Sequence, residues 1–143
     1  MADLSRLTGG ARHVTDAGNA SRTLLFDLRE GRWSGELCEL FGVPENARPE
    51  VVPSYGEIRR TDPAAFLGLN VLNAGDQQAA LFGQGCFDTG RSMCTNGTGS
   101  FMLVNIGPTP ALSSRLLTTV AWMAPEVALT YALEGSVFVT GAR

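Results

Sequence analysis

The apolar and polar positions divide the chain into two unlike parts. In the second part, short apolar runs alternate with glycines and other small residues, which is typical of strands joined by tight turns. The runs cover residues 101–106, 116–124, 127–133 and 136–139. We therefore predict a β-rich second part. Its last two runs form either two strands or one strand bent at Glu134 and Gly135.

The first part is more polar and predicts shorter elements. Residues 24–28 are apolar enough for a short strand. Ser34 is a suitable N-cap for a helix over residues 35–41, and Gly42 would end that helix. One side of the helix would carry the apolar residues Leu37, Cys38, Leu40 and Phe41.

Cap and turn formers are dense between these elements. Thr15 and Asp16 are followed by Asn19 and Ser21. We interpret the segment as a hydrogen-bonded loop that orders the residues after it, because such side chains bond readily to nearby backbone groups. His13 is the only histidine of the chain. With no second histidine or cysteine near it in the sequence, we expect a structural role for it.

The segment that follows residues 66–72 concentrates polar chemistry. We predict that residues 66–72 lead into a buried central strand, which starts with the apolar run of Val71 and Leu72 and runs into a short helix over residues 79–82. Asp76, Gln77 and Gln78 lie between the two. Polar groups at the carboxyl end of a strand lie where open α/β folds bind ligands. An Asp at a helix start is also what N-capping alone selects, so both interpretations of Asp76 stay open.

A β-hairpin is predicted over residues 92–104. Asn96 and Gly97 make the strongest short-range hairpin signal, and Thr98 and Gly99 extend the turn beyond what a plain hairpin needs. Two glycines around a hydroxyl leave backbone N–H groups bare, so that a phosphate can approach them closely. The turn is therefore a candidate phosphate site.

Composition narrows the classes of function. All 11 basic residues are Arg, so a P-loop lysine is excluded, and the net charge of −3 argues against a nucleic-acid partner. No run of eighteen apolar residues indicates a membrane span. The three cysteines lack metal-ligand spacing and are expected to be reduced thiols of a cytoplasmic protein: Cys38, Cys86 and Cys94.

Charge is distributed unevenly along the chain. Residues 1–62 carry 18 of the 25 charged side chains, and residues 63–143 carry seven. So few charges are unusual for a protein surface. We therefore expect the second part to be covered, either by self-association or by segments that this chain lacks.

Residues 75–84, GDQQAALFGQ, together with the Gly-Thr-Gly turn, resemble the FGGY family of carbohydrate kinases. Three further blocks match in the same order: residues 13–27, 116–122 and 131–139. Within the family they resemble the glycerol kinases more than the pentose and gluconate kinases. The resemblance covers nearly the whole chain, but only about the middle third of such a kinase.

The resemblance implies an α/β fold that is a fragment of the two-lobed actin-like (RNase H-like) ATPase fold. Residues 1–86 would be the carboxyl-terminal part of the amino-terminal sugar-kinase lobe. Residues 91–143 would be the first strands of the carboxyl-terminal nucleotide-binding lobe. The implied reaction is ATP-dependent phosphoryl transfer to the terminal hydroxyl of glycerol.

Roles for particular residues follow from the same resemblance. Asp76 would be the catalytic base and a glycerol ligand, Gln77 a second glycerol ligand, and Phe101 a contact for the carbon chain. The residues that would meet the nucleotide phosphates are Gly97, Thr98, Gly99 and Gly141. We assign no metal ligand, and we expect a structural role for Glu134.

The match is incomplete. The family's segment that gives an Arg-Glu pair and aromatic residues to the polyol has no counterpart in this chain, nor has its Gly-rich segment around the adenine. The family uses ATP with magnesium, but nothing before His13 resembles its magnesium-binding Asp hairpin. Asn96 stands where the family usually has an aromatic residue, and Asn73 where it prefers an apolar one. We therefore expect the isolated chain to be inactive. The alternative is a non-catalytic fragment or pseudo-enzyme that acts by binding a nucleotide or a partner chain.

Overall fold

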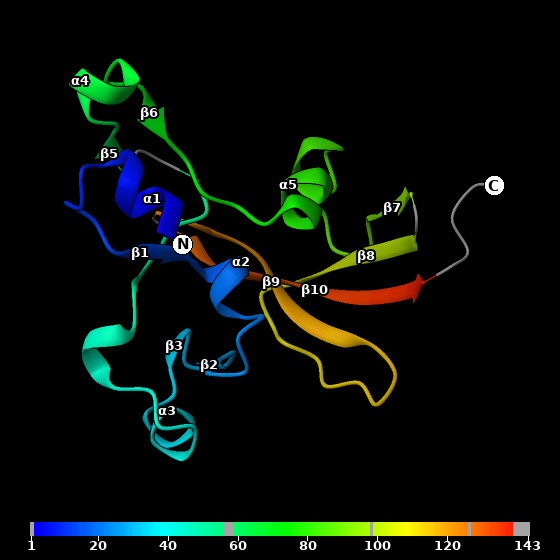
Figure 1. Ribbon diagram of the computed structural model, residues 1–143. Coiled ribbons are helices and arrows are strands. Elements are labelled where there is room, and N and C mark those ends of the chain that lie inside the picture. The colour runs from blue at the N-terminus through cyan, green and yellow to red at the C-terminus, as the bar shows by residue number, and fades with distance from the viewer. Residues whose placement is uncertain (1, 56–58, 98, 126, 139–143) are drawn as a thin grey trace.

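A computed structural model of the chain describes residues 2–55, 59–97, 99–125 and 127–138 (Figure 1). The first part is built of short elements: α1 (Ala2–Leu7), β1 (Val14–Asp16), α2 (Ala17–Ala20), β2 (Phe26–Asp27), β3 (Arg32–Trp33), α3 (Gly35–Leu40), a 3-10 turn (Glu45–Ala47), β4 (Glu50–Val52), β5 (Arg59–Arg60), α4 (Pro63–Phe66), β6 (Asn70–Val71) and α5 (Asp76–Gly83). Longer strands follow: β7 (Ser92–Asn96), β8 (Gly99–Gly107), β9 (Leu117–Ala124) and β10 (Val127–Phe138).

The four long strands form one antiparallel sheet in the order β7-β8-β10-β9. The predicted β-rich second part is therefore confirmed. β10 is one strand that runs through Glu134 and Gly135, so the single-strand alternative is correct. Glu134 pairs with Leu103 on β8, and Ser136 pairs with Phe101. This register places the Glu134 and Phe101 positions near each other on neighbouring strands.

The predicted hairpin is present at β7 and β8, with Asn96 opposite Ser100. Ser100 Oγ donates a hydrogen bond of 2.8 Å to Asn96 Oδ1, so the asparagine helps to hold the turn. Gly97 N–H donates to the Gly99 carbonyl at 2.8 Å. It is thus used inside the turn, which corrects the expectation that this N–H is bare.

Asp16 orders the segment after it, as the sequence predicts. It lies at the end of β1, which pairs in parallel with β4, and it is the N-cap of α2. Its carboxylate accepts hydrogen bonds from Gly18 N at 2.9 Å and from Ser54 Oγ at 3.4 Å. The side chain is almost fully buried, so these donors take the place of water.

The helix predicted after Ser34 is also present. Ser34 Oγ accepts a hydrogen bond from Leu37 N at 3.2 Å, and Gly42 follows the helix with a φ of 66°. The predicted apolar side is only partly correct. Cys38 is buried, whereas Leu40 and Phe41 are 74% and 59% exposed. Nothing in the described part of the chain covers them.

The buried central strand predicted at the end of residues 66–72 is only the two-residue strand β6, which lies outside the main sheet. Asp62 caps α4, with Pro63 in its first turn, and the chain then turns at Leu67 and Gly68, both with positive φ. β6 pairs only with β5, and Leu72 is 62% exposed. The helix that starts at Asp62 and Pro63, and the turn that follows it, leave room for only the two-residue strand β6.

The strand predicted at residues 24–28 is shorter than expected, because Leu24 has a φ of 63° and is exposed. Only Phe26–Asp27 pair, with β3.

Two apolar clusters join the parts of the chain at the sheet. Leu81 on α5 is fully buried with Leu103 and Trp122 from β8 and β9. Ala17 and Ala20 on α2 pack with Val120 and Tyr131 from β9 and β10. α2 and α5 therefore both contact β9, and the two helices meet the same region of the sheet (Figure 1).

Candidate functional site

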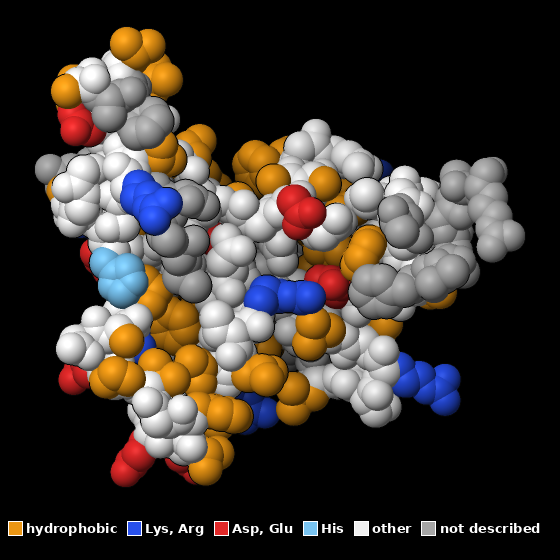
Figure 2. Space-filling model, viewed as in Figure 1, with side chains coloured by type: hydrophobic (Ala, Val, Ile, Leu, Met, Phe, Trp, Pro, Cys, Tyr) orange, Lys and Arg blue, Asp and Glu red, His pale blue; other side chains and the backbone are white. Residues whose placement is uncertain are grey.

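A polar cleft of about 360 Å³ opens where the start of α5 faces the end of α2 and the strands β8 and β10. Its lining residues are Asn19, Arg22, Gly75, Asp76, Gln77, Gln78, Phe101 and Glu134. Acidic and basic side chains lie close together at the middle of this face of the molecule (Figure 2). The cleft therefore joins residues that are up to 115 positions apart in the chain (134 − 19).

Asp76 is the first residue of α5, and Gly75 is the N-cap. The interpretation of Asp76 as the N-cap is therefore wrong, because the N-cap is the residue before it. Its Oδ1 accepts a hydrogen bond from Gln77 N at 2.8 Å, and the side chain is exposed to the cleft. A carboxylate in the first turn of a helix interacts favourably with the aligned backbone dipoles.

Gln77 and Phe101 line the same cleft as Asp76. Gln77 Oε1 is buried and has no hydrogen-bond partner among the described residues. An unsatisfied buried acceptor costs about 1–3 kcal/mol, which a hydroxyl donor would offset. The Phe101 side chain is half-buried on β8 and gives the cleft an apolar wall. The three residues together offer a carboxylate, an amide and a ring.

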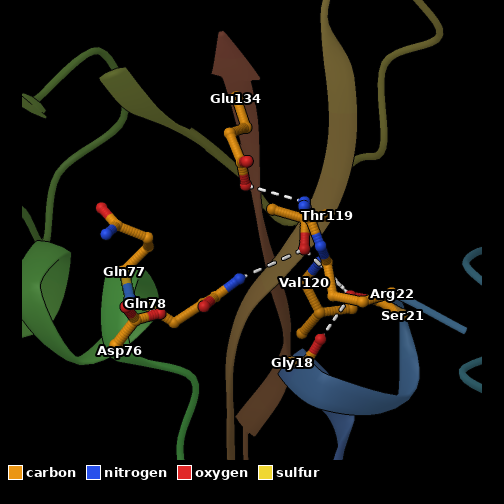
Figure 3. A network of polar contacts seen from close by, with 9 residues as sticks. All are labelled: Gly18, Ser21, Arg22, Asp76, Gln77, Gln78, Thr119, Val120 and Glu134. Carbon is orange, nitrogen blue, oxygen red and sulfur yellow. Dashed lines mark hydrogen bonds and ion pairs between the residues drawn. The ribbon is translucent and has the colours of Figure 1, made fainter. Parts of the chain in front are cut away.

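Gln78 connects the start of α5 to the sheet. Its Nε2 donates to Thr119 Oγ1 at 3.4 Å, and that hydroxyl lies 2.9 Å from Ser21 Oγ (Figure 3). Ser21 Oγ in turn donates to Gly18 O at 2.7 Å and accepts from Val120 N at 3.2 Å. This network fixes α2, α5 and β9 relative to one another around the cleft.

Arg22 and Glu134 form an ion pair across the cleft, with 2.8 Å between Nη1 and Oε2. The Glu134 side chain is 8% exposed and that of Arg22 is 41% exposed. The sequence did not identify Arg22 as a residue of the site, because no local pattern indicates an ion-pair partner that lies 112 residues away.

The expected nucleotide residues lie elsewhere or cannot be placed. Gly97 and Gly99 flank the β7–β8 turn and do not line the cleft. Gly99 and Phe101 both lie on β8, so the turn is at the end of the same strand that lines the cleft. Thr98 and Gly141 fall outside the described residues.

The described residues do not supply a ready-made cluster of metal ligands. Among them, no group of three or more His, Cys, Asp or Glu side chains could hold a metal ion. Of the two carboxylates in the cleft, Glu134 is already paired with Arg22. We therefore assign no step of the chemistry in this chain to a metal. In the same part of the chain, no helix has the length and apolar character needed to cross a bilayer.

Residues 4–83 match the N-terminal domain of the FGGY family of carbohydrate kinases. This match covers more than half of the chain, which therefore belongs to that family.

Among similar proteins, glycerol kinase of Bdellovibrio bacteriovorus is 49% identical in an alignment of 143 positions that covers 97% of this chain and 29% of that enzyme. Glycerol kinase of Thermococcus onnurineus is 53% identical in an alignment of 140 positions that covers 96% of this chain and 28% of that enzyme. The chain thus spans less than a third of the length of these relatives.

Solved structures of carbohydrate kinases resemble the fold of this chain. Plasmodium falciparum glycerol kinase with ADP superimposes with a TM-score of 0.87 and 34% identity, covering 95% of this chain and 28% of that one. Xylulose kinase of Rhodospirillum rubrum gives a TM-score of 0.79 at 22% identity over the same share of each chain, which shows the fold alone. The predicted fold class is confirmed: a mixed α/β part of the actin-like fold of these kinases.

Proposed function

We propose that this chain forms the base-bearing wall of the glycerol site in a glycerol kinase. The observation that carries the proposal is the gathering of Asp76, Gln77 and Phe101 in one polar cleft. The similarity to glycerol kinases, including one solved with ADP, supports glycerol and ATP as the substrates.

Asp76 is the proton acceptor in this proposal. As the terminal hydroxyl oxygen of glycerol attacks the γ-phosphorus of ATP, its proton passes to the Asp76 carboxylate and the bond to the β-phosphate oxygen breaks. The hydrogen bond from Gln77 N holds one carboxylate oxygen, which orients the group. General base catalysis of this kind contributes typically ~10²–10⁴ in rate.

Gln77 and Phe101 select and orient the polyol. The Gln77 amide can exchange hydrogen bonds with a glycerol hydroxyl, which would satisfy the unpaired Oε1. The Phe101 ring would pack on the carbon chain. Positioning of this sort matters because a displacement of about 1 Å at a reacting group can cost ~10²-fold in rate.

In this proposal the nucleotide binds at the turn of residues 97–99 and at Gly141, and the boundary between the two lobes lies near residues 85–90. Since the chain spans less than a third of the length of the glycerol kinases that it matches, we propose that this chain alone has little kinase activity.

A second candidate is a non-catalytic role that depends on association. An apolar cleft of about 330 Å³ behind α5 is lined by aromatic and aliphatic side chains, among them Tyr55, Leu72, Phe82 and Trp122. Phe82 and Leu72 are 40% and 62% exposed. Exposed apolar area of this kind favours contact with another chain. Sedimentation velocity decides this point: a monomer at all concentrations argues against self-association.

The catalytic proposal is tested in a chimera in which this chain replaces the matching 140 residues of the Thermococcus onnurineus enzyme. ADP formation that depends on glycerol is measured for the chimera and two variants. Asp76→Asn should lower kcat at least ~10²-fold, as loss of a general base does. Asp88→Asn, the same change at an exposed carboxylate outside the cleft, should not. Equal rates for the chimera and Asp76→Asn would refute the role of Asp76.

A further inference from the structure

The charges in the cleft do not suit the product of the proposed reaction unless a cation takes part. Asp76 and Glu134 are both acidic, and Arg22 is the only cation among the described lining residues. Glycerol is neutral, but a phosphate monoester carries about −1.5 to −2 charges at pH 7. Next to two carboxylates, such a group is repelled. The one residue of the cleft that can offset this charge is Arg22.

The Arg22 side chain is bound to Glu134 on one side and is exposed to the cleft on the other. Glu134 accepts from Nη1 at 2.8 Å, and Glu134 is itself 8% exposed, so the anchor is fixed in the sheet. A guanidinium has five N–H donors in a planar fork. At 41% exposure, Arg22 has donors left for the cleft, in a group whose geometry matches two phosphate oxygens.

The backbone of Arg22 is also fixed. α2 is capped by the buried Asp16, and Ser21, the residue before Arg22, bonds to Thr119 and Val120 of β9. The main chain at Arg22 is therefore tied to β9 while its side chain is tied to β10 (Figure 3). A cation held in this way loses little freedom when an anion binds, which strengthens the interaction.

We propose that Arg22 binds the phosphate of the phosphorylated polyol and the phosphoryl group during its transfer, while Glu134 positions the guanidinium. The inference rests on the proposed function. Arg22 donates N–H groups to the phosphoryl oxygens and keeps all its protons. The oxygen–phosphorus bond forms at glycerol and breaks at ADP, and the hydroxyl proton goes to Asp76. A phosphate bound here lies on the sheet side of the cleft, opposite α5.

The competing explanation is that Arg22 only neutralises the buried carboxylate of Glu134. In that case Arg22 matters for stability and has no effect on ligand preference. The two explanations differ in one readout: the ratio of affinities for glycerol 3-phosphate and for glycerol.

Both affinities are measured on the 143-residue chain by isothermal titration calorimetry, with a thermal unfolding curve for each variant. Arg22→Gln should weaken glycerol 3-phosphate binding at least about tenfold, as loss of a charge-assisted contact does, and change glycerol binding less than about twofold. Arg22→Lys keeps the charge without the fork and should give an intermediate loss. Arg115→Gln, at an exposed loop outside the cleft, is the matched control and should change neither affinity.

Glu134→Gln removes the anchor and leaves the cation. It should reduce glycerol 3-phosphate affinity by a smaller factor than Arg22→Gln. If Arg22→Gln does not fold, Arg22→Lys and Glu134→Gln decide the question with the same ratio. Equal effects on both ligands, or a lowered Tm with no change in the ratio, would overturn the proposal in favour of the structural ion pair.

The outcomes separate this inference from the proposed function. Binding of glycerol without binding of glycerol 3-phosphate overturns the role of Arg22 and leaves the polyol site standing. Binding of glycerol 3-phosphate through Arg22 without binding of glycerol supports the anion site and contradicts the polyol site. Binding of neither ligand overturns both.

Discussion

Gln78 on α5 donates a hydrogen bond to the Thr119 hydroxyl on β9, with 3.4 Å between Nε2 and Oγ1. This bond connects the helix that begins with Asp76 to the sheet that carries Glu134. Ser21 meets the same hydroxyl at 2.9 Å, so one threonine joins both helices at the cleft. The shape of the cleft therefore depends on a polar network rather than on apolar packing alone.

Thr119→Val tests this network. The change keeps the shape of the side chain and removes its hydroxyl, so the buried Gln78 amide and Ser21 each lose a partner. We expect the free energy of unfolding to fall by about 1–3 kcal/mol. Urea unfolding measures it. Thr109→Val, at an exposed loop position, is the control and should stay within about 0.5 kcal/mol of wild type. An equally small effect at Thr119 would mean that the network does not stabilise the fold.

Asp16→Ala removes the cap of α2. Loss of an N-cap costs about 0.5–2 kcal/mol, and we expect the upper end here because Ser54 also loses its acceptor. Asp62 caps α4 in a more exposed position, with 2.9 Å between its Oδ1 and Ala64 N. Asp62→Ala should therefore cost less, when both variants are compared by thermal unfolding. The reverse order would contradict the importance of buried capping at Asp16.

Leu81→Ala tests the packing of α5 on the sheet. Leu81 is fully buried against Leu103 and Trp122, so truncation leaves a cavity and should cost about 2–5 kcal/mol. Leu112→Ala is the matched control, because Leu112 is 81% exposed and should cost under about 0.5 kcal/mol. Chemical denaturation of both variants gives the comparison. Similar costs would mean that α5 is not anchored through Leu81.

Tyr131 makes the free energy of unfolding depend on pH in the alkaline range. Burial, and then the negative charge of Asp27, raise the pKa of the Tyr131 phenol above its usual 10.0. The folded state therefore holds this proton more tightly than the unfolded state. Its contribution is complete below about pH 10, the unfolded pKa, and is lost as the pH rises through the folded pKa.

Tyr131→Phe removes this titration and also the hydrogen bond that the hydroxyl donates to the Leu28 carbonyl. The variant should be less stable at neutral pH but should lose less stability as the pH is raised above ~10. Unfolding curves over that pH range provide the measurement. Parallel pH profiles for the two proteins would contradict the shifted pKa.

The sequence predicted the features that depend on near neighbours. Ser34 caps its helix as expected, Asp16 orders the segment after it, and Asn96 and Gly97 make the turn of a hairpin, because such signals act within a few residues. Asp76 and Phe101 were matched to one site by resemblance, and the structure places both in one cleft. Their chemical roles stay predictions.

Two features could not be predicted in this way. The partnership of Arg22 with Glu134 spans 112 residues, and neither side chain stands in a motif that reports the other. The central, buried position expected for the strand at Val71 and Leu72 is wrong for a different reason. Its apolar composition suggested burial, but Asp62 and Gly68 impose a helix start and a turn, and Leu72 remains exposed.

The most direct test of the central claim is an NMR titration of the ¹⁵N-labelled chain with glycerol. We predict that the largest amide shifts occur at residues 75–78, at Phe101 and at Glu134, and that Asp76→Asn removes them while Asp88→Asn leaves them unchanged. Shifts centred elsewhere, or a response that Asp76→Asn does not alter, would contradict the assignment of this cleft as the glycerol site.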